Sequence, residues 1–202
     1  YIPSPSPSVT VNAGDLDHLI IRNAPNEGGS EVTSVSMTAD DQLSLYAAGY
    51  DASNNYLGDY TAEWVSTGSL DEISFNGDNL VFEPVLAPSS GTLIAQVGSI
   101  SDATGTITVG VGTLDHIRIN DSAGSGGVEV TTLTLSSGQS VDLYTSGYDS
   151  DNNYISAVST DWSRTGTLDP VGGPGSSITF TPTTAPSQGT IEATDGIRSD
   201  AT

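Results

Sequence analysis

The chain has 202 residues and a formal net charge of −21, with 25 acidic residues against four basic ones. This balance excludes nucleic acid and anionic membrane surfaces as partners, because both are negatively charged and would repel the protein. The chain has no cysteine, which excludes disulfides and thiolate metal sites, and no stretch approaches the ~20 apolar residues of a membrane-spanning helix, so no membrane insertion is expected.

Residues 1–14 form an N-terminal extension that starts with YIPSPSP. A Pro- and Ser-rich segment is predicted to be extended and without secondary structure of its own. The single methionine is Met37, so Tyr1 is not the product of a start codon. We therefore expect either that a signal segment has been removed or that the chain is part of a longer one. Together with the composition, this favours an extracellular or cell-surface protein.

Residues 15–112 are predicted to form a first domain made of strands, because apolar residues alternate with polar ones and turn clusters separate the runs. Trp64 is expected to fill the core from a central strand. The predicted strands are 18–22, 31–37, 42–50, 60–65, 79–84 and 91–98.

Residues 113–202 repeat the first domain without insertion or deletion. Leu16 matches Leu114, Trp64 matches Trp162, and every other matched pair has the same offset of 98 positions. The sequence therefore predicts an all-β protein of two tandem immunoglobulin-like β-sandwich domains of ~100 residues each. The strands expected in the second domain are 116–120, 129–135, 140–148, 158–162, 177–182 and 189–194.

The run GYDSDNNYISAVSTDWSRTGTLD, residues 147–169, is similar to bacterial Ig-like domains of the invasin and intimin type. In that family a strand ends in an Asp- and Asn-rich turn and leads into a strand that carries a tryptophan. The similarity covers nearly all of both repeats. It implies tandem domains that form stalks or adhesive parts of surface proteins, and its motifs are structural, so it implies no particular ligand.

The two repeats are out of phase with the two ends of the sequence. PSVTVNAGDLDH, residues 7–18, aligns with GTITVGVGTLDH, residues 105–116, at the same offset of 98. The sequence thus starts with a final-strand pattern, and it stops at the tetrapeptide SDAT, which continues into a strand in the first copy. We therefore expect the second domain to lack its own last strand and to leave an open strand edge.

Donor-strand complementation is the main functional hypothesis, in which the N-terminal segment of one copy completes the second domain of another. A head-to-tail contact of this kind generates an open filament resembling a pilus, so the expected partners are copies of the same chain. The donor residues would be Val9, Val11 and Ala13. The acceptor groove would be lined by Ile178, Phe180 and Ile191. The alternative is a stalk or adhesin segment cut from a longer tandem array, which binds a surface glycan or protein ligand elsewhere.

A calcium site is a further candidate, because carboxylate and amide oxygens alternate in the second copy at Asp149, Asp151 and Asn153. The first copy offers Asp51 and Asn55, with Ser53 in place of the middle Asp. The glycine and the closing Glu of a helical calcium loop are absent. The competing interpretation is a turn in which Asp and Asn bond their own main chain. No other cofactor is expected.

Aromatic and histidine residues near the turns are candidate binding or catalytic groups. The tyrosines would form a sugar-stacking platform in a carbohydrate-binding accessory module, or they cover the end of each sandwich; they are Tyr50, Tyr56, Tyr60, Tyr148 and Tyr154. His18 and His116 each follow an Asp, but no nucleophile elbow, metal cluster or phosphate-binding loop accompanies them. The sequence therefore predicts a protein that is not an enzyme.

Overall fold

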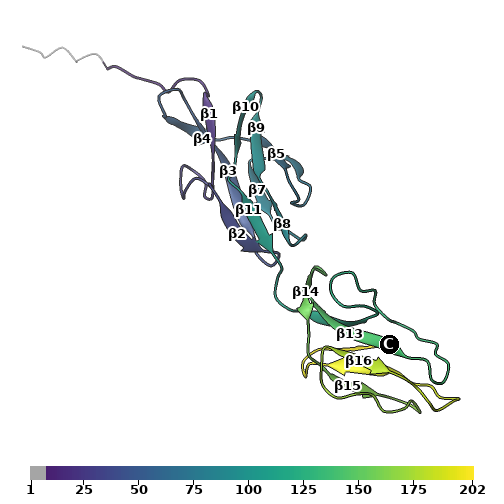
Figure 1. Ribbon diagram of the computed structural model, residues 1–202. Coiled ribbons are helices and arrows are strands. Elements are labelled where there is room, and N and C mark those ends of the chain that lie inside the picture. The colour runs from purple at the N-terminus through teal and green to yellow at the C-terminus, as the bar shows by residue number, and fades with distance from the viewer. Residues whose placement is uncertain (1–7) are drawn as a thin grey trace, which may run out of the picture. The chain divides into compact units, whose positions relative to one another are not determined.

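The computed structural model describes residues 8–202, and every regular element among them is a strand (Figure 1). The chain divides into two compact units. The first contains residues 41–84, 89–109 and the described residues up to 37, and the second contains 38–40, 85–88 and 110–202. Of the residues described, none belongs to a helix long and apolar enough to cross a bilayer. The predicted all-β fold is confirmed.

Two antiparallel sheets form the body of the first unit. In one, β3 (Leu43–Tyr50) pairs with β1 (His18–Arg22), β4 (Tyr56–Asp59) and β7 (Asn79–Phe82). The other has the order β10-β9-β5-β6, with bounds Ile100–Ala103, Leu93–Val97, Ala62–Ser66 and Ser74–Gly77. Successive side chains of a strand point to opposite faces, so alternate residues enter the core between the sheets. In immunoglobulin strand letters, β1, β3 and β7 take the places of A, B and E, and β5, β9 and β10 take those of C, F and G. This arrangement is that of an immunoglobulin-like sandwich.

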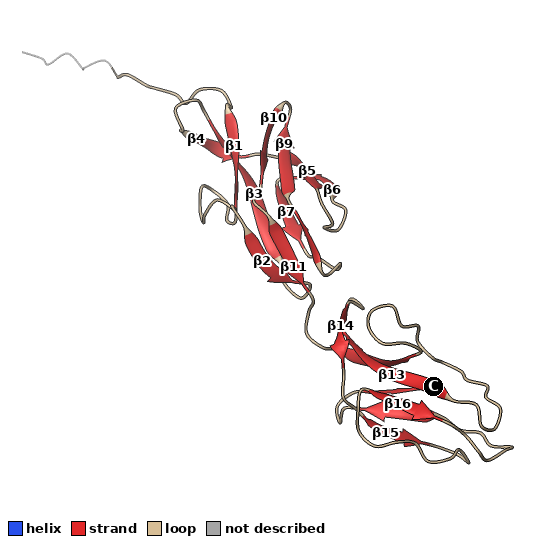
Figure 2. Cartoon of the chain, in the orientation of Figure 1, coloured by secondary structure: helices blue, strands red, loops and turns tan. Residues whose placement is uncertain are grey.

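The first unit also has a small third sheet, in the order β2-β11-β8 (Figure 2). The middle strand, β11 (Ile107–Gly110), pairs antiparallel with β8 (Ser89–Gly91). On its other side lies β2 (Val35–Thr38), which runs in the same direction. The hydrogen bonds show this direction, since Val35 N donates to Thr106 O and Ala39 N donates to Gly110 O. The third sheet closes the sandwich along one side.

The second unit repeats the two main sheets except for β6, at whose place the structure has only an isolated bridge between Thr160 and Gly175. In one, β13 (Val141–Tyr148) pairs with β12 (His116–Asn120), β14 (Tyr154–Ala157) and β16 (Ser177–Phe180). The other has the order β15-β17-β18, with bounds Asp161–Arg164, Ile191–Thr194 and Ser199–Ala201. Their core is one cluster of buried side chains from both sheets: Ile119, Val130, Leu143, Trp162, Ile178, Phe180, Ile191 and Ala193.

Both tryptophans are core residues, as predicted. Trp64 is fully buried on β5 and Trp162 is buried on β15. Each indole Nε1 donates to a backbone carbonyl of its own unit, that of Gly77 at 3.3 Å and that of Gly175 at 2.9 Å. The one polar atom of each large side chain is thereby satisfied inside the core.

The repeated tetrapeptide SDAT joins the two sheets of each unit. Asp102 on β10 accepts a hydrogen bond from Ile21 N on β1 at 2.7 Å. Asp200 on β18 accepts the equivalent bond from Ile119 N on β12 at 2.6 Å. The second copy of SDAT is therefore a strand, and it matches β10. Neither copy of SDAT was predicted as a strand, and the pattern predicted as the final strand of the first unit is β11, which follows β10.

One predicted strand of the second unit, residues 129–135, is not formed. Only Glu129 takes part in pairing, as an isolated bridge to Asn120. In the first unit the matching segment contains β2, whose partner is β11. Because a strand is stabilised by its ladder, residues 129–135 stay irregular where no neighbour is present.

Candidate strand-binding groove

The candidate site lies in the second unit, at the position that β11 occupies in the first unit. Ile107 and Val109 are both fully buried, whereas Thr108 between them is exposed. The antiparallel register places Ile107 opposite Gly91 and Val109 opposite Ser89. A short strand with two apolar side chains facing inward therefore completes the first sandwich.

A groove of about 400 Å³ lies at the corresponding place in the second unit. One side is formed by residues 131–137, which match the β2 segment, and the other by residues 182–189, which match the β8 segment. The side chains of Leu168, Phe180, Ile191 and Thr202 also line it. The groove thus lies between the two segments that flank β11 in the first unit.

Exposure of the groove residues differs from that of their counterparts. Leu70 is buried, while the matching Leu168 is half-buried. On the opposite side Leu133 is 38% exposed, which is high for a leucine facing a core. The groove therefore presents apolar surface that the first unit covers.

The structure places two of the three predicted acceptor residues in the groove. All three belong to the buried cluster of the second unit, but only Phe180 and Ile191 also line the groove. Sequence reasoning missed Leu133, Leu135 and the other members of residues 131–137. The repeat contains the signal that could have found them, since these residues match the segment that holds β2.

The predicted donor residues are open to solvent in the described chain. Val9 is 87% exposed, Val11 is 89% exposed, and Ala13 is exposed as well. Residues 8–13, here called the donor segment, belong to no strand. Gly14 N donates to Asp51 Oδ2 at 2.8 Å and attaches the chain to the first unit immediately after the donor segment. The rest of the predicted extension, residues 1–7, lies outside the described residues.

Charge is absent from both the groove and the donor segment. The sequence has 25 acidic residues, yet the donor segment has none and no residue that lines the groove is charged. An incoming strand with a carboxylate facing the groove would lose hydration without gaining a partner. The two surfaces therefore match in having no charged side chain, and each contributes apolar side chains to the contact.

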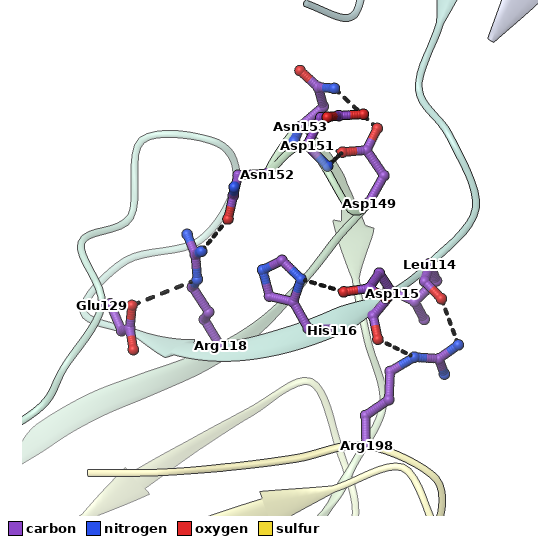
Figure 3. A network of polar contacts seen from close by, with 10 residues as sticks. All are labelled: Leu114, Asp115, His116, Arg118, Glu129, Asp149, Asp151, Asn152, Asn153 and Arg198. Atoms are coloured by element: carbon purple, nitrogen blue, oxygen red, sulfur yellow. Dashed lines mark hydrogen bonds and ion pairs between the residues drawn. The ribbon is translucent and has the colours of Figure 1, made fainter. Parts of the chain in front are cut away.

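The calcium candidates are engaged in hydrogen bonds within their turns (Figure 3). Asp149 Oδ1 accepts from the backbone N of Asp151 at 3.1 Å and of Asn153 at 2.8 Å. Its Oδ2 accepts from Gly112 N at 2.9 Å and from Asn153 Nδ2 at 3.0 Å. N–H donors thus surround the carboxylate on both oxygens. This geometry is that of the turn interpretation, because a cation would have to displace these donors.

The first unit shows the same arrangement at Asp51. Ser53 N and Asn55 N donate to Oδ1, each at 2.9 Å, and Asn55 Nδ2 donates to Oδ2 at 2.8 Å. Within residues 8–202, no three or more His, Cys, Asp or Glu side chains form a group suited to a metal ion. The acidic turns therefore act as backbone caps in both units.

The hydrogen bonds also set the acidity of the two aspartates. The amide of Asn55, followed by Gly14 N, holds the pKa of Asp51 well below its usual range. Burial acts to raise the pKa of Asp149, but the bonds from Gly112 and Asn153 outweigh it, and its pKa is lowered too. Both side chains are therefore ionised at neutral pH and accept hydrogen bonds as carboxylates.

The tyrosines and histidines pack against one another. His18 stacks on Tyr50 with 5.5 Å between ring centroids, and His116 stacks on Tyr148 at 5.6 Å. Tyr50 and Tyr148 are buried. Tyr56 donates to Asp59, and burial together with this bond raises the pKa of Tyr56 to about 12. Tyr60 and Tyr154 are half-buried. The rings therefore cover their own strands.

Each histidine also contacts the Asp that precedes it. His18 Nδ1 lies 3.1 Å from Asp17 Oδ2, and His116 Nδ1 lies at the same distance from Asp115 Oδ2. In the second unit Arg198 binds the carbonyls of Leu114 and Asp115, and Arg118 contacts Asn152 and Glu129 (Figure 3). These contacts fasten the start of β12 to neighbouring turns. The contact between the histidine and the preceding Asp occurs in both repeats, which is expected of a structural role.

Comparison with family models finds no match for this chain. No curated protein matches it either. Among solved structures, it is similar to the crystal structure of Dpr2 Ig1-Ig2 in complex with DIP-Theta Ig1-Ig3, at 12% sequence identity and a TM-score of 0.32. The match covers 91% of this chain and 63% of that chain. The description of each unit as a sandwich therefore rests on the strand order given above.

Proposed function

We propose that this protein is a structural subunit of an extracellular filament, in which the donor segment of one copy fills the groove of the next. The observation that carries the proposal is the groove of the second unit. It lies at the position that corresponds to that of β11 in the first unit. The donor segment has the pattern of β11, with Val9 and Val11 at the positions of Ile107 and Val109. Adding a strand to an open edge is a recurrent mode of protein association.

The arrangement supplies one donor and one acceptor per copy. The first unit contains its own β11, so it offers no second groove of this kind among the described residues. A contact between two different surfaces does not close on itself unless the rotation brings the ends together. Copies joined in this way form linear, unbranched chains with a direction.

Burial of the two valines supplies the main driving force. Each apolar side chain of this size contributes ~1.5–3 kcal/mol when it is fully buried, so the pair contributes about 3–6 kcal/mol. The absence of charge from both surfaces keeps the net charge of −21 out of the contact. The surrounding acidic surface keeps assembled chains apart. The role is mechanical, with no catalytic step, and the high acidity and lack of cysteine suit an extracellular location.

A stalk segment of a longer cell-surface protein is the second candidate. The exact repeat of 98 positions favours it, because tandem arrays are built from such units. In that case a strand that continues after Thr202 fills the groove of its own unit. The donor segment then completes whatever domain precedes it. No observation favours a carbohydrate-binding module, since the candidate tyrosines are packed.

The proposal is tested on the full chain by light scattering after gel filtration and by negative-stain microscopy. Deleting residues 1–13 is expected to leave monomers. Val9→Asp combined with Val11→Asp is expected to do the same without unfolding, because both side chains are exposed in the single copy. Thr10→Asp is the matched control, since the equivalent Thr108 is exposed in β11. Fibres formed by the deletion variant would overturn the proposal.

A further inference from the structure

We propose that the groove accepts the incoming strand in one register only, with Val9 opposite Gly189, Thr10 opposite Gln188 and Val11 opposite Ser187. This inference rests on the proposed function and adds to it the orientation and pairing of the bound segment. The donor segment then runs antiparallel to residues 187–189 and parallel to residues 133–136. The register follows from β11, whose partners Gly91, Ser90 and Ser89 match these three residues.

The edge that would pair with the strand is already held in place. Thr167 N donates to Gln188 O at 2.9 Å, and Gln188 N donates to Thr167 Oγ1 at 3.0 Å. In the first unit Ser69 N donates to Ser90 O at 2.8 Å, and Ser90 N donates to Ser69 Oγ at 2.9 Å. The edge next to β11 and the edge beside the groove are thus built in the same way. The groove needs no rearrangement of this edge before it binds.

These bonds also determine which backbone groups face the strand. Since both backbone groups of Gln188 are engaged by Thr167, the ladder to an incoming strand uses the groups of Ser187 and Gly189. In an antiparallel pair, hydrogen-bonded and non-hydrogen-bonded positions alternate. Val9 and Val11 therefore take the hydrogen-bonded positions, and Thr10 faces Gln188 at a non-hydrogen-bonded position.

Other registers present the wrong side chains to the groove. A shift by one residue turns every side chain to the other face, so Thr10 would enter the groove and both valines would face water. A shift by two residues in one direction replaces a valine by Ala13. The opposite shift brings Pro7 into the ladder, and proline has no N–H to donate. Only the proposed register buries two valines.

The entry of the strand is also restricted. At Gly105, which precedes β11, a Cβ atom would lie 1.1 Å from Thr33 O, so the backbones approach too closely for any side chain. The donor sequence has Pro7 at the matching position. A strand from another copy therefore cannot follow the path of β11 before Ser8, and pairing starts with the donor segment itself.

Disulfide cross-linking tests the register, because the chain has no cysteine of its own. Directly opposed residues at a non-hydrogen-bonded position have Cα atoms about 4.5 Å apart, a separation that a disulfide spans. Copies carrying Thr10→Cys are mixed with copies carrying Gln188→Cys and oxidised gently. The linked peptides are then identified by mass spectrometry. We expect a heterodimer joined through these two positions.

Two controls are provided by the same chain. Thr108→Cys with Ser90→Cys places the equivalent pair inside one copy, and it is expected to close in full whatever the state of assembly. Asn12→Cys mixed with Gln188→Cys moves the donor cysteine two residues along on the same face. Its yield is expected to be at least tenfold lower than that of the Thr10 pair.

The outcomes separate this inference from the proposed function. If copies assemble and the Asn12 pair links better than the Thr10 pair, the register is wrong while donor-strand assembly stands. Assembly with no linkage between the donor segment and Gln188 places the contact outside the groove and overturns the inference. If the mixed copies remain monomers, with the internal Thr108–Ser90 pair closed, the proposed function itself fails.

Discussion

In the first unit Leu70 is buried and its neighbourhood includes a complete third sheet, whereas the matching Leu168 of the second unit lines an open groove. The main sheets of the two units are otherwise alike. Apart from β6, which has no counterpart strand in the second unit, they share strand order, tryptophan packing, acidic turns and the Asp of the SDAT tetrapeptide that joins the sheets. Within the described residues, the second unit has its two main sheets and its core with no strand at the place of β11, so β11 of the first unit adds cover on one side of a core that the main sheets build.

The largest expected effect comes from supplying the second unit with the missing component. Residues 105–112, GTITVGVG, are appended after Thr202, so that the second unit has the sequence that contains β11. The added strand should fill the groove and stabilise the unit by about 3–6 kcal/mol, from two buried apolar side chains. Thermal unfolding followed by circular dichroism measures the gain. The self-association that the proposed function requires should also be lost.

Two controls sharpen this result. Appending the same eight residues with Asp at both inward positions should give neither stabilisation nor loss of assembly. If the original chain and the chain with the unaltered extension assemble to the same extent, the groove is not the site of contact.

The converse change opens the first unit. Ile107→Ala removes a fully buried side chain of β11 and should destabilise the first unit by about 2–5 kcal/mol. Val9→Ala at the matching position of the donor segment should leave the stability of the single copy unchanged, because Val9 is 87% exposed. Urea denaturation of dilute, monomeric samples compares the two. An equal loss for both variants would contradict the assignment of Val9 to a free segment.

Leu70→Ala and Leu168→Ala measure how much cover β11 and its sheet provide. Leu70 is buried and its truncation should cost about 2–5 kcal/mol. Truncation of the half-buried Leu168 should reduce the stability of the single copy less than truncation of Leu70. We expect a difference of about 1 kcal/mol, because part of the Leu168 side chain is already exposed. In the chain extended by residues 105–112 the two costs should converge. A difference that persists there would mean that the groove is not the cause.

The smallest effect is the response to acid, and it should be the same in both units. Asp51 and Asp149 have lowered pKa values in the folded state. Their contribution to stability is therefore fully present above the unfolded value of ~3.9 and is lost as the pH falls through the lower folded value. Urea unfolding between pH 2 and pH 7 should show a decline that starts near pH 4.

Asp51→Asn and Asp149→Asn serve as the test of this response. Each variant should be less stable than the original chain at pH 7, and the gap should narrow toward pH 2. A gap that does not change with pH would show that the carboxylate charge contributes nothing to the turn.

Most of the fold was predictable because the same strand pattern occurs in both repeats. Alternation of apolar residues located β1, β3, β7 and their counterparts, and the position of Trp64 and Trp162 in the core follows from their size and apolar character. The segment 129–135 was predicted as a strand and is irregular, because strand formation there depends on a partner that sequence periodicity does not reveal.

The candidate site was predictable in part. The offset of 98 identified Val9 and Val11 with Ile107 and Val109, and it led to Phe180 and Ile191 in the groove. It did not show that Ile178, a residue of the buried cluster, is absent from the lining of the groove. Ile178 and Phe180 are both buried residues of one short strand, and which of them reaches the groove depends on the neighbouring loops.

The sequence alone determined the all-β class, the two matched units and the segment with the pattern of β11, since these depend on local alternation and on comparison of the chain with itself. The tertiary structure decided that residues 131–137 and 182–189 enclose the groove, that the acidic turns cap backbone N–H groups, and that Tyr50 and Tyr148 are buried. Those features arise where segments distant in the chain meet. Residue patterns show which apolar side chains are expected to be buried, and only the folded chain shows which of them are buried.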